Sequence, residues 1–305
     1  MLEICFLGTG AMMPLPERKL AALLLRRGGR LLLLDCGEGT QVAIRQCGWS
    51  LARIDMICLT HFHADHVAGL PGLLLTMGAC NRTEPITLVG PAGLEAVVRC
   101  LRVIAPELPY ALRFLELPAR AHSFAFHDMQ VTGFALDHLT PCYGYALSLE
   151  RPGKFDPARA KTLGIPVRHW RTLQSGEAVT IGDRRYAPDQ VLGPARRGIK
   201  LAYCTDTRAT DAIATHAADA DLLICEGTYG EDDKAEKAAQ YGHMTFSQAA
   251  GLAKRAGARE LLLTHFSPSV SEPQAHIEAA RAVFPNANAA HDLLCRTLLF
   301  EETSS

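Results

Sequence analysis

The chain has 305 residues, of which 48% are hydrophobic, and its formal net charge at pH 7 is −1. This composition supplies enough apolar side chains for a sizeable core, in one large domain or two modest ones. The near-zero charge excludes a protein that attracts polyanions through its net charge. No apolar stretch approaches a membrane span, and the first residues lack the basic flank and long apolar core of a signal peptide. We therefore expect neither.

The ten cysteines are scattered along the chain without a C-x-x-C pair. Several of them, including Cys36, Cys58, Cys204 and Cys225, fall in or beside apolar, strand-like runs. Such positions favour buried, reduced thiols over disulfides or a thiolate zinc site. The cysteine usage therefore predicts a cytoplasmic protein.

The first part of the chain alternates short apolar runs with loops. Strands are predicted at Ile4–Leu7, Leu31–Leu34, Ile54–Thr60 and Ile86–Val89. Helices are predicted at Thr40–Cys47, Leu70–Met77 and Gly93–Ile104. Continuous apolar runs of this length are typical of strands that are covered on both faces.

The later part of the chain continues the alternation. Further strands are predicted at 112–117, 123–127, 130–136, 143–149, 200–204, 221–225, 260–264 and 296–300. Helices are predicted at Thr245–Ala256, with Thr245 as the N-cap, and at Pro273–Phe284.

Residues 151–195 differ from the rest of the chain because prolines and glycines recur throughout them. This pattern predicts an inserted, partly extended arm rather than a compact second domain. From Arg151 to Lys200 there are eleven Lys and Arg against four Asp and Glu, a local charge of +7, so the remaining residues sum to −8. Charge alone leaves two interpretations open, a phosphate-binding surface and an ordinary solvated basic face.

The stretch His61-Phe62-His63-Ala64-Asp65-His66 holds three histidines and an aspartate directly after a predicted strand. Imidazole and carboxylate are the preferred ligands of zinc and its first-row neighbours. Ligand sites in α/β layers tend to lie at the carboxyl ends of strands. The alternative is a polar loop whose imidazoles satisfy nearby backbone groups. Four ligand-type residues in six positions favour a metal site.

Three further strand ends carry residues of the same kind, His138, Asp206 and His265. Each by itself is more often a capped, solvated or turn residue, but each ends a predicted strand as the first cluster does. The complete set is five histidines and two aspartates. That is too many for one tetrahedral zinc and enough for two metals bridged by a carboxylate.

His61-x-His63-x-Asp65-His66 is the signature of the metallo-β-lactamase superfamily, and within it the chain resembles the ribonuclease Z family of tRNA 3′-processing endonucleases along essentially its whole length. The resemblance is carried by Leu7–Gly10, Asp35–Gln41, Gly69–Leu74, His138, Pro141–Tyr145, Pro152–Asp156, Leu163–Pro166, Asp206-Thr207, Glu226–Thr228, His243–Thr245 and Thr264–Ser267. It implies an α/β fold, an αβ/βα sandwich of two mixed β-sheets flanked by helices. Residues 1–305 would form one such domain, with the basic arm inserted at 151–195.

The resemblance also implies two zinc ions per subunit. The two sets of ligands would be His61, His63 and His138 for one ion and Asp65, His66 and His265 for the other, with Asp206 bridging them. Histidine and carboxylate ligands also accept manganese or iron. Two such metals polarise a scissile phosphate and activate a shared water for in-line attack, with Asp65 placed to accept its proton. By resemblance His243 is the general acid for the leaving ribose 3′-oxygen, and Glu226 orients its imidazole.

In the ribonuclease Z family the arm clamps the tRNA elbow, usually that of the partner subunit in a homodimer. The resemblance therefore implies a pre-tRNA substrate, a homodimer and no membrane partner. A positive arm suits phosphate contacts whose affinity falls steeply with salt. The candidate RNA-binding residues are Arg18, Arg151, Lys154, Lys161, Arg168 and Arg171.

The chain departs from the family outside the expected metal ligands. The departures are at Cys225, at Met244, in the loop Pro14–Lys19, at the arm tip Val167-Arg168 and at Pro268–Val270. The leading interpretation is a zinc endoribonuclease that cuts pre-tRNA 3′ of the discriminator nucleotide. The altered loop and arm tip support the nearest alternative, a phosphodiesterase of the same superfamily that acts on small or cyclic diesters. A non-catalytic RNA- or metal-binding protein is the third interpretation.

Overall fold

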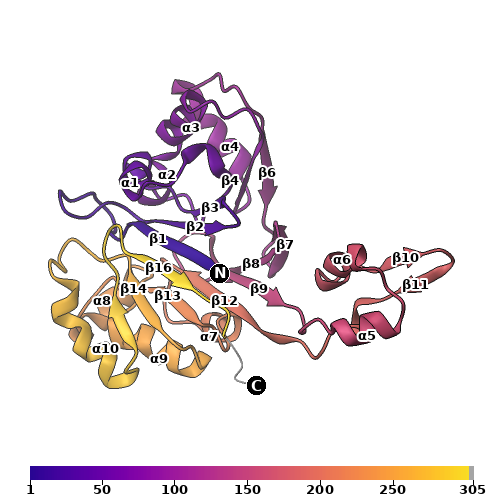
Figure 1. The fold of residues 1–305 in the computed structure, drawn as a ribbon. Coiled ribbons are helices and arrows are strands. Elements are labelled where there is room, and N and C mark those ends of the chain that lie inside the picture. Colours follow the sequence, from indigo (N-terminus) through magenta and orange to yellow (C-terminus); the bar gives the residue numbers. More distant parts are fainter. Residues whose placement is uncertain (302–305) are drawn as a thin grey trace. The chain divides into compact units, whose positions relative to one another are not determined.

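Two seven-stranded β-sheets form the larger of two units into which the chain divides (Figure 1). The computed structural model describes residues 1–301. The larger unit comprises Met1–Leu147 and Lys200–Leu299, and the smaller unit comprises Ser148–Ile199 with Phe300 and Glu301. No helix within residues 1–301 is long and apolar enough to cross a membrane.

The first sheet has the strand order β16-β1-β2-β3-β4-β5-β6. Its strands are β1 (Leu2–Gly8), β2 (Ala22–Arg27), β3 (Arg30–Leu34), β4 (Ile54–Cys58), β5 (Ile86–Gly90), β6 (Leu112–Glu116) and β16 (Cys295–Leu298). The pairs from β16 to β3 are antiparallel and those from β3 to β6 are parallel, so the sheet is mixed.

The second sheet has the strand order β15-β14-β13-β12-β9-β8-β7. Its strands are β7 (His122–Phe126), β8 (Met129–Leu136), β9 (Cys142–Arg151), β12 (Arg196–Cys204), β13 (Leu222–Glu226), β14 (Leu261–Thr264) and β15 (Ala287–Ala289). The pairs from β12 to β15 are parallel, whereas β7 and β8 are antiparallel.

Each sheet is covered by its own helices (Figure 1). Beside the first sheet lie α1 (Thr40–Cys47), α2 (Ala64–Val67), α3 (Leu70–Ala79) and α4 (Leu94–Leu101), and beside the second lie α7 (Asp211–His216), α8 (Ala235–Gln240), α9 (Phe246–Ala256) and α10 (Ile277–Val283). Leu31 and Leu33 of β3 belong to the cluster of apolar side chains under the first set of helices. Leu32 and Leu34 are equally buried on the opposite face, because successive side chains of a strand alternate. The predicted two mixed sheets flanked by helices are confirmed.

Two predicted helices differ from the structure, and strands β2, β15, β10 (Val179–Ile181) and β11 (Arg184–Tyr186) were not predicted. Gly93–Ile104 and Pro273–Phe284 are each an α-helix joined to a 3₁₀ turn, at Arg102–Ile104 and at Pro273–His276 respectively. Strand β2 was not predicted, although its apolar run leads through Gly28-Gly29 into β3. Both glycines have positive φ, 57° and 79°, which is the conformation that a tight hairpin turn requires.

The smaller unit has a core of its own. It contains α5 (Pro157–Thr162), α6 (Trp170–Gln174) and the hairpin of β10 (Val179–Ile181) and β11 (Arg184–Tyr186). Its buried apolar residues are Ala160, Ile165, Leu173, Val179, Tyr186 and Val191. At its base the amide of Gly193 donates to the carbonyl of Lys154 at 2.9 Å. Residues that are spaced widely in this segment of the sequence thus converge on one small core.

Arg82, between α3 and β5, is a buried charge that the sequence did not reveal. It is only 1% exposed. Its guanidinium donates to the carbonyls of Ala52, Glu84 and Pro85 at 2.7–2.9 Å and pairs with Asp55 at 3.0 Å. It therefore ties the loops before β4 and β5 together.

We predict that Arg82→Ala lowers the free energy of unfolding by about 1–3 kcal/mol, because it leaves three backbone carbonyls without their donor and removes one of the partners of Asp55. The measurement is urea unfolding followed by circular dichroism. Arg99→Ala is the control, since Arg99 is an exposed helix residue paired with Glu95, and should change stability by less than about 0.5 kcal/mol. Equal midpoints for the two variants would contradict the prediction.

Candidate metal centre

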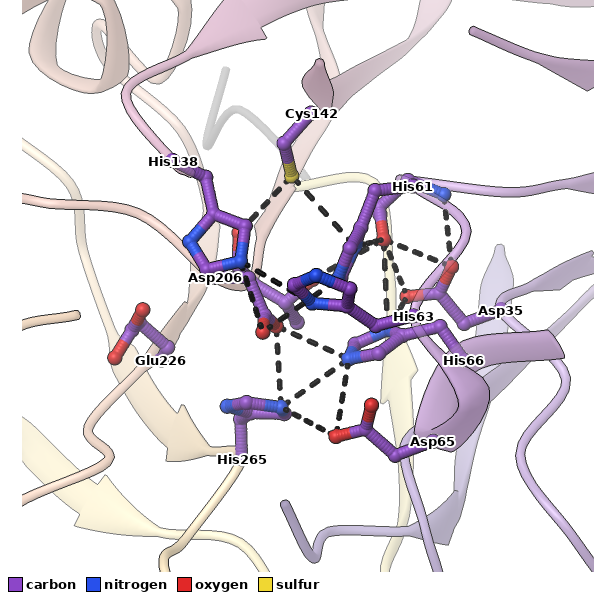
Figure 2. A network of polar contacts seen from close by, with 12 residues as sticks. Asp35, His61, His63, Asp65, His66, His138, Cys142, Asp206, Glu226 and His265 are labelled. Carbon is purple, nitrogen blue, oxygen red and sulfur yellow. Dashed lines mark hydrogen bonds and ion pairs between the residues drawn. The ribbon is translucent and has the colours of Figure 1, made fainter. Parts of the chain in front are cut away.

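Four strand ends of the larger unit meet in one buried polar cluster (Figure 2). His61 follows β4, His138 follows β8, Asp206 follows β12 and His265 follows β14. His63, Asp65 and His66 belong to the short turn and helix α2 that continue from His61. All seven residues that the sequence singled out as ligands are therefore brought together.

The Asp206 carboxylate lies in the middle of this cluster (Figure 2). Its Oδ2 is 3.6 Å from His61 Nε2 and 3.9 Å from His138 Nε2. Its Oδ1 is 3.1 Å from both His66 Nε2 and His265 Nε2. One carboxylate thus faces two pairs of imidazoles with its two oxygens.

His63 and Asp65 lie on opposite sides of the Asp206 carboxylate, and each adds a ligand-type atom to the imidazoles on its side. His63 Nδ1 lies 3.4 Å from His138 Nε2, on the side of Asp206 Oδ2. Asp65 Oδ2 lies 3.6 Å from His265 Nε2 and 3.7 Å from His66 Nε2, on the other side. The potential ligand atoms of His61, His63, His138 and Asp206 lie within 4.8 Å of one another, as do those of Asp65, His66 and His265.

Two of the central residues have a strained backbone. Asp206 and His265 have positive φ angles of 45° and 58°. For a histidine this conformation is uncommon, and such residues persist only where surrounding structure holds them. The two side chains meet, with Asp206 Oδ1 3.1 Å from His265 Nε2.

His66 is oriented by a carboxylate that the sequence did not single out. Its Nδ1 lies 2.8 Å from Asp35 Oδ2, and Asp35 is completely buried. Asp35 also accepts from the Thr60 amide at 2.8 Å and from the Tyr203 hydroxyl at 3.2 Å. A carboxylate behind a histidine fixes the ring and leaves Nε2 free for a ligand bond. The available signal was the position of Asp35 directly after β3.

Three other imidazoles, those of His61, His138 and His265, are held in the same manner through Nδ1. The partners are Thr60 Oγ1 at 3.0 Å for His61, the Gly242 carbonyl at 2.9 Å for His138 and Thr228 Oγ1 at 3.2 Å for His265. The Nε2 atoms of all three rings consequently face the centre.

Two buried polar atoms of the cluster lack hydrogen bonds within the described part of the chain, which indicates a cation site. His61 Nε2 and Asp206 Oδ1 are buried but have no hydrogen-bond partner among residues 1–301, even though Asp206 Oδ1 approaches two imidazole nitrogens. Buried polar atoms without hydrogen bonds are costly. Nitrogen and carboxylate donors that crowd together in this way fit a shared divalent cation.

The protonation of the cluster suits such a role. Burial, helped by the nearby His66, lowers the pKa of His61, and burial lowers that of His138, which favours the neutral, ligating imidazole. Burial acts to raise the pKa of Asp206, but His265 and His66 outweigh it and hold that pKa well below its usual range. Burial also opposes the charge on His66, but Asp206 and Asp35 raise its pKa. A bound metal would replace that proton.

His243 and Glu226 form a pair beside the cluster. Glu226, at the end of β13, is completely buried, and its Oε1 lies 2.9 Å from His243 Nδ1. Glu226 also accepts from the amides of Thr207 at 2.6 Å and Met244 at 3.1 Å. Burial opposes the charge on His243, but Glu226, with Asp206 and Asp65, raises its pKa to about 9. The ring centroid of His243 is 5.3 Å from that of His138.

An open cavity of about 550 Å³ gives access to the cluster. Its polar lining includes the side chains His63, Asp65, His138, Asp206, His243 and His265. Its other lining residues include Met12, Met13, Leu139 and Tyr241. A substrate in this cavity would therefore contact members of both sets of candidate ligands and His243.

The candidate RNA-binding residues fall in different places. Arg18 is only 9% exposed, and its guanidinium donates to the carbonyl of Ser271 at 2.8 Å and lies over the ring of Phe266. It supports the loop that carries it, and we do not assign it an RNA contact. Of the arm residues, Lys154, Lys161, Arg168 and Arg171 are exposed on the smaller unit. Arg151 lies over the ring of Phe300.

Comparisons with known proteins agree with this geometry. A sequence model of the beta-lactamase superfamily domain matches residues 30–266. The chain is 52% identical over 302 residues to a ribonuclease Z of Lachnospira eligens, with 99% of each chain covered. It is 49% identical over 302 residues to a ribonuclease Z of Lachnoclostridium phytofermentans, again with 99% of each chain covered.

Solved structures share the fold. The crystal structure of the short form of human tRNase Z matches with a TM-score of 0.70 at 27% identity, covering 98% of this chain and 100% of that one. Unliganded yeast PDE1 matches with a TM-score of 0.58 at 13% identity, covering 95% of this chain and 98% of that one, which is a likeness of fold alone. The predicted metallo-β-lactamase fold is confirmed.

We predict that a chelator lowers the melting temperature of the metal-loaded protein, because a ligand bound only by the folded state stabilises it. The stabilisation is about 3–4 kcal/mol when free metal is 100–1,000 times its dissociation constant. In Asp206→Ala the chelator effect should shrink sharply, since both ligand sets lose a member. The control Asp211→Ala removes an exposed carboxylate that pairs with Arg255 and should keep the full effect. Scanning calorimetry measures all three, and an undiminished effect in Asp206→Ala would count against the site.

Proposed function

Because the chain belongs to the ribonuclease Z family of the metallo-β-lactamase superfamily, we propose that it is a metal-dependent endoribonuclease that hydrolyses the phosphodiester 3′ of the discriminator nucleotide in pre-tRNA. The observation that carries this proposal is the cluster of seven ligand-type side chains beside the His243–Glu226 pair, with five of the seven and His243 lining one open cavity. Relatives named ribonuclease Z at 52% and 49% identity over the whole chain support the same substrate.

We assign the seven residues to two divalent cations, zinc in the first instance, with manganese or iron as substitutes that the same ligands accept. One cation would be held by His61, His63 and His138 and the other by Asp65, His66 and His265, with Asp206 shared. When bound, two such cations polarise a phosphate and lower the pKa of an attacking water.

Asp65 is placed to handle the proton of that water. It lines the cavity, and its Oδ2 accepts a hydrogen bond from the Met12 amide at 2.7 Å. Burial acts to raise the pKa of Asp65, but its hydrogen bond with His265 and the charge of nearby His66 outweigh burial and hold that pKa below its usual range, so the carboxylate is ionised at neutral pH. An ionised, anchored carboxylate at the cavity wall is a suitable proton acceptor.

His243 is placed to protonate the leaving ribose 3′-oxygen. Its Nδ1 is held by Glu226, so the proton that it offers to a substrate is the one on Nε2. Cations at the centre would neutralise Asp65 and Asp206, which leaves Glu226 as the group that keeps His243 protonated. A general acid of this kind contributes about 10²–10⁴-fold to the rate.

The smaller unit would hold the body of the tRNA. Its excess of Lys and Arg, with Lys154, Lys161, Arg168 and Arg171 exposed and Arg151 at its base, suits contacts to phosphates. A homodimer in which one subunit's arm holds the tRNA cleaved by its partner, and a cytoplasmic location, belong to the same proposal.

The decisive assay compares a 3′-extended tRNA precursor with bis(p-nitrophenyl) phosphate. We expect the zinc-loaded protein to cleave both. Replacing Lys161, Arg168 and Arg171 together by Ala should raise KM for the precursor and flatten its salt dependence, by about one unit of log–log slope for each phosphate that is no longer bound. The control replaces three exposed arginines of the larger unit, Arg99, Arg113 and Arg120, and so changes the net charge equally.

Two outcomes would overturn the proposal. If the diester is hydrolysed and the precursor is not cleaved, the protein is a small-diester phosphodiesterase. If neither substrate is cleaved, it is a binding protein. Equal effects of the two triple substitutions would remove the arm from RNA binding while leaving the chemistry in place.

We predict that His243→Ala lowers kcat on the precursor by about 10²–10⁴-fold while metal content is retained. The diester should be far less affected, because p-nitrophenolate leaves without a proton. The general acid must be protonated, so wild-type kcat should fall as pH rises through the pKa of His243, which Glu226 raises above its usual value. Glu226→Gln removes the main charge that raises this pKa and should move the fall to lower pH. Superimposable pH profiles would exclude His243 as the titrating acid.

A further inference from the structure

Exposed apolar side chains gather at the mouth of the cavity. Within residues 1–301 eleven large hydrophobic side chains are exposed, and four of them line this one cavity. They are Met12, Met13, Leu139 and Tyr241, with 63%, 53%, 59% and 49% of their surfaces exposed. Single exposed apolar residues need no explanation, but a cluster around a polar reaction centre indicates a binding surface.

The four side chains form two pairs. Met12 and Met13 adjoin Asp65, because the Met12 amide donates to Asp65 Oδ2 at 2.7 Å. Met12 has a φ of 66°, which is uncommon for a residue with a side chain. The backbone is thus held in a strained form that keeps this pair at the cavity mouth.

The second pair, Leu139 and Tyr241, adjoins the opposite set of functional residues. Leu139 follows His138 directly, and Tyr241 precedes Gly242, whose carbonyl lies 2.9 Å from His138 Nδ1. A Cβ added at Gly242 would lie 2.5 Å from His138 Nδ1 and 3.4 Å from Leu139 Cγ, so the two segments are packed closely together. Tyr241 is also two residues from His243.

We propose that these two pairs are nucleobase sites on either side of the scissile phosphate, an inference that rests on the function proposed above. Leu139 and Tyr241 receive the base of the nucleotide 5′ of the cut, and Met12 and Met13 receive the base on its 3′ side. Base faces are the apolar surfaces that an RNA strand offers, and unpaired bases stack on aromatic side chains and pack against methionine.

The chemistry of the cut fixes which base goes to which pair. Water supplies the oxygen that bonds to phosphorus, the bond from phosphorus to the ribose 3′-oxygen breaks, and His243 gives its proton to that oxygen. The 5′ nucleotide carries the 3′-oxygen, so its base lies on the side of His243, beside Tyr241 and Leu139. The 3′ nucleotide keeps the phosphate, and the pair left for its base is Met12 and Met13, beside Asp65.

A double-mutant cycle between enzyme and substrate tests the inference. The substrates are the intact precursor and two precursors that lack one base, either 5′ or 3′ of the cut. Removing the 5′ base should lower kcat/KM of the wild type about tenfold or more. The double variant Leu139→Ala, Tyr241→Ala should have a low kcat/KM on the intact precursor. Removing the 5′ base should lower that kcat/KM little further. Met12→Ala with Met13→Ala should behave likewise toward the 3′ base, and each double variant should still respond to the other base.

Two controls separate base binding from a structural effect. Tyr241→Phe keeps the ring and should retain the full response to the 5′ base. Leu75→Ala removes an exposed leucine of α3 that does not line the cavity, and its responses should equal those of the wild type.

The base sites would be overturned if the losses of kcat/KM were additive. In that case each double variant would respond to base removal as strongly as the wild type, even if the variant itself is slow. That result leaves the proposed function standing, because the precursor is still cut. A wild type that hydrolyses bis(p-nitrophenyl) phosphate but no precursor would overturn the proposed function, and the base sites with it.

Discussion

The buried carboxylate of Asp206 is the feature on which the rest of the centre depends. An isolated carboxylate in a protein interior is expensive, and this one is offset by imidazoles on both of its oxygens, His61 and His138 on one side and His66 and His265 on the other. Those partners come from strands of both sheets. The sandwich must therefore bring the carboxyl ends of its strands to one edge before the charge can be accommodated.

The groups behind the imidazoles are as important as the imidazoles. Asp35, Thr228 and the Gly242 carbonyl each take the second nitrogen of a ring and so decide which nitrogen faces the centre. Glu226 does the same for His243 and raises its pKa. Histidine therefore has two different roles in this site. The central imidazoles offer a lone pair to a cation, whereas His243 donates a proton to a leaving group.

Chemistry and substrate choice are separated in the molecule. The centre is built from buried residues at strand ends, where packing fixes positions to within the tolerance of a metal site. The residues that we connect with RNA are exposed, on the basic smaller unit and at the apolar mouth of the cavity. Among the departures from the family, Pro268 and Ser269 line the cavity and Val167-Arg168 are exposed on the smaller unit. Cys225 and Met244 are instead buried next to Glu226 and His243, and no departure replaces a hydrolytic residue.

The sequence by itself determined the metal-type residues, the order of the main strands and the fold family, because ligand spacing and apolar runs are local features of the chain. Only the tertiary structure decided that Asp35 orients His66, that Arg18 is buried and that Met12 and Tyr241 share a cavity. These relations join residues that are far apart in the chain. Local sequence patterns carry no information about these long-range contacts, because the contacts form only when the two sheets pack and their strand ends converge.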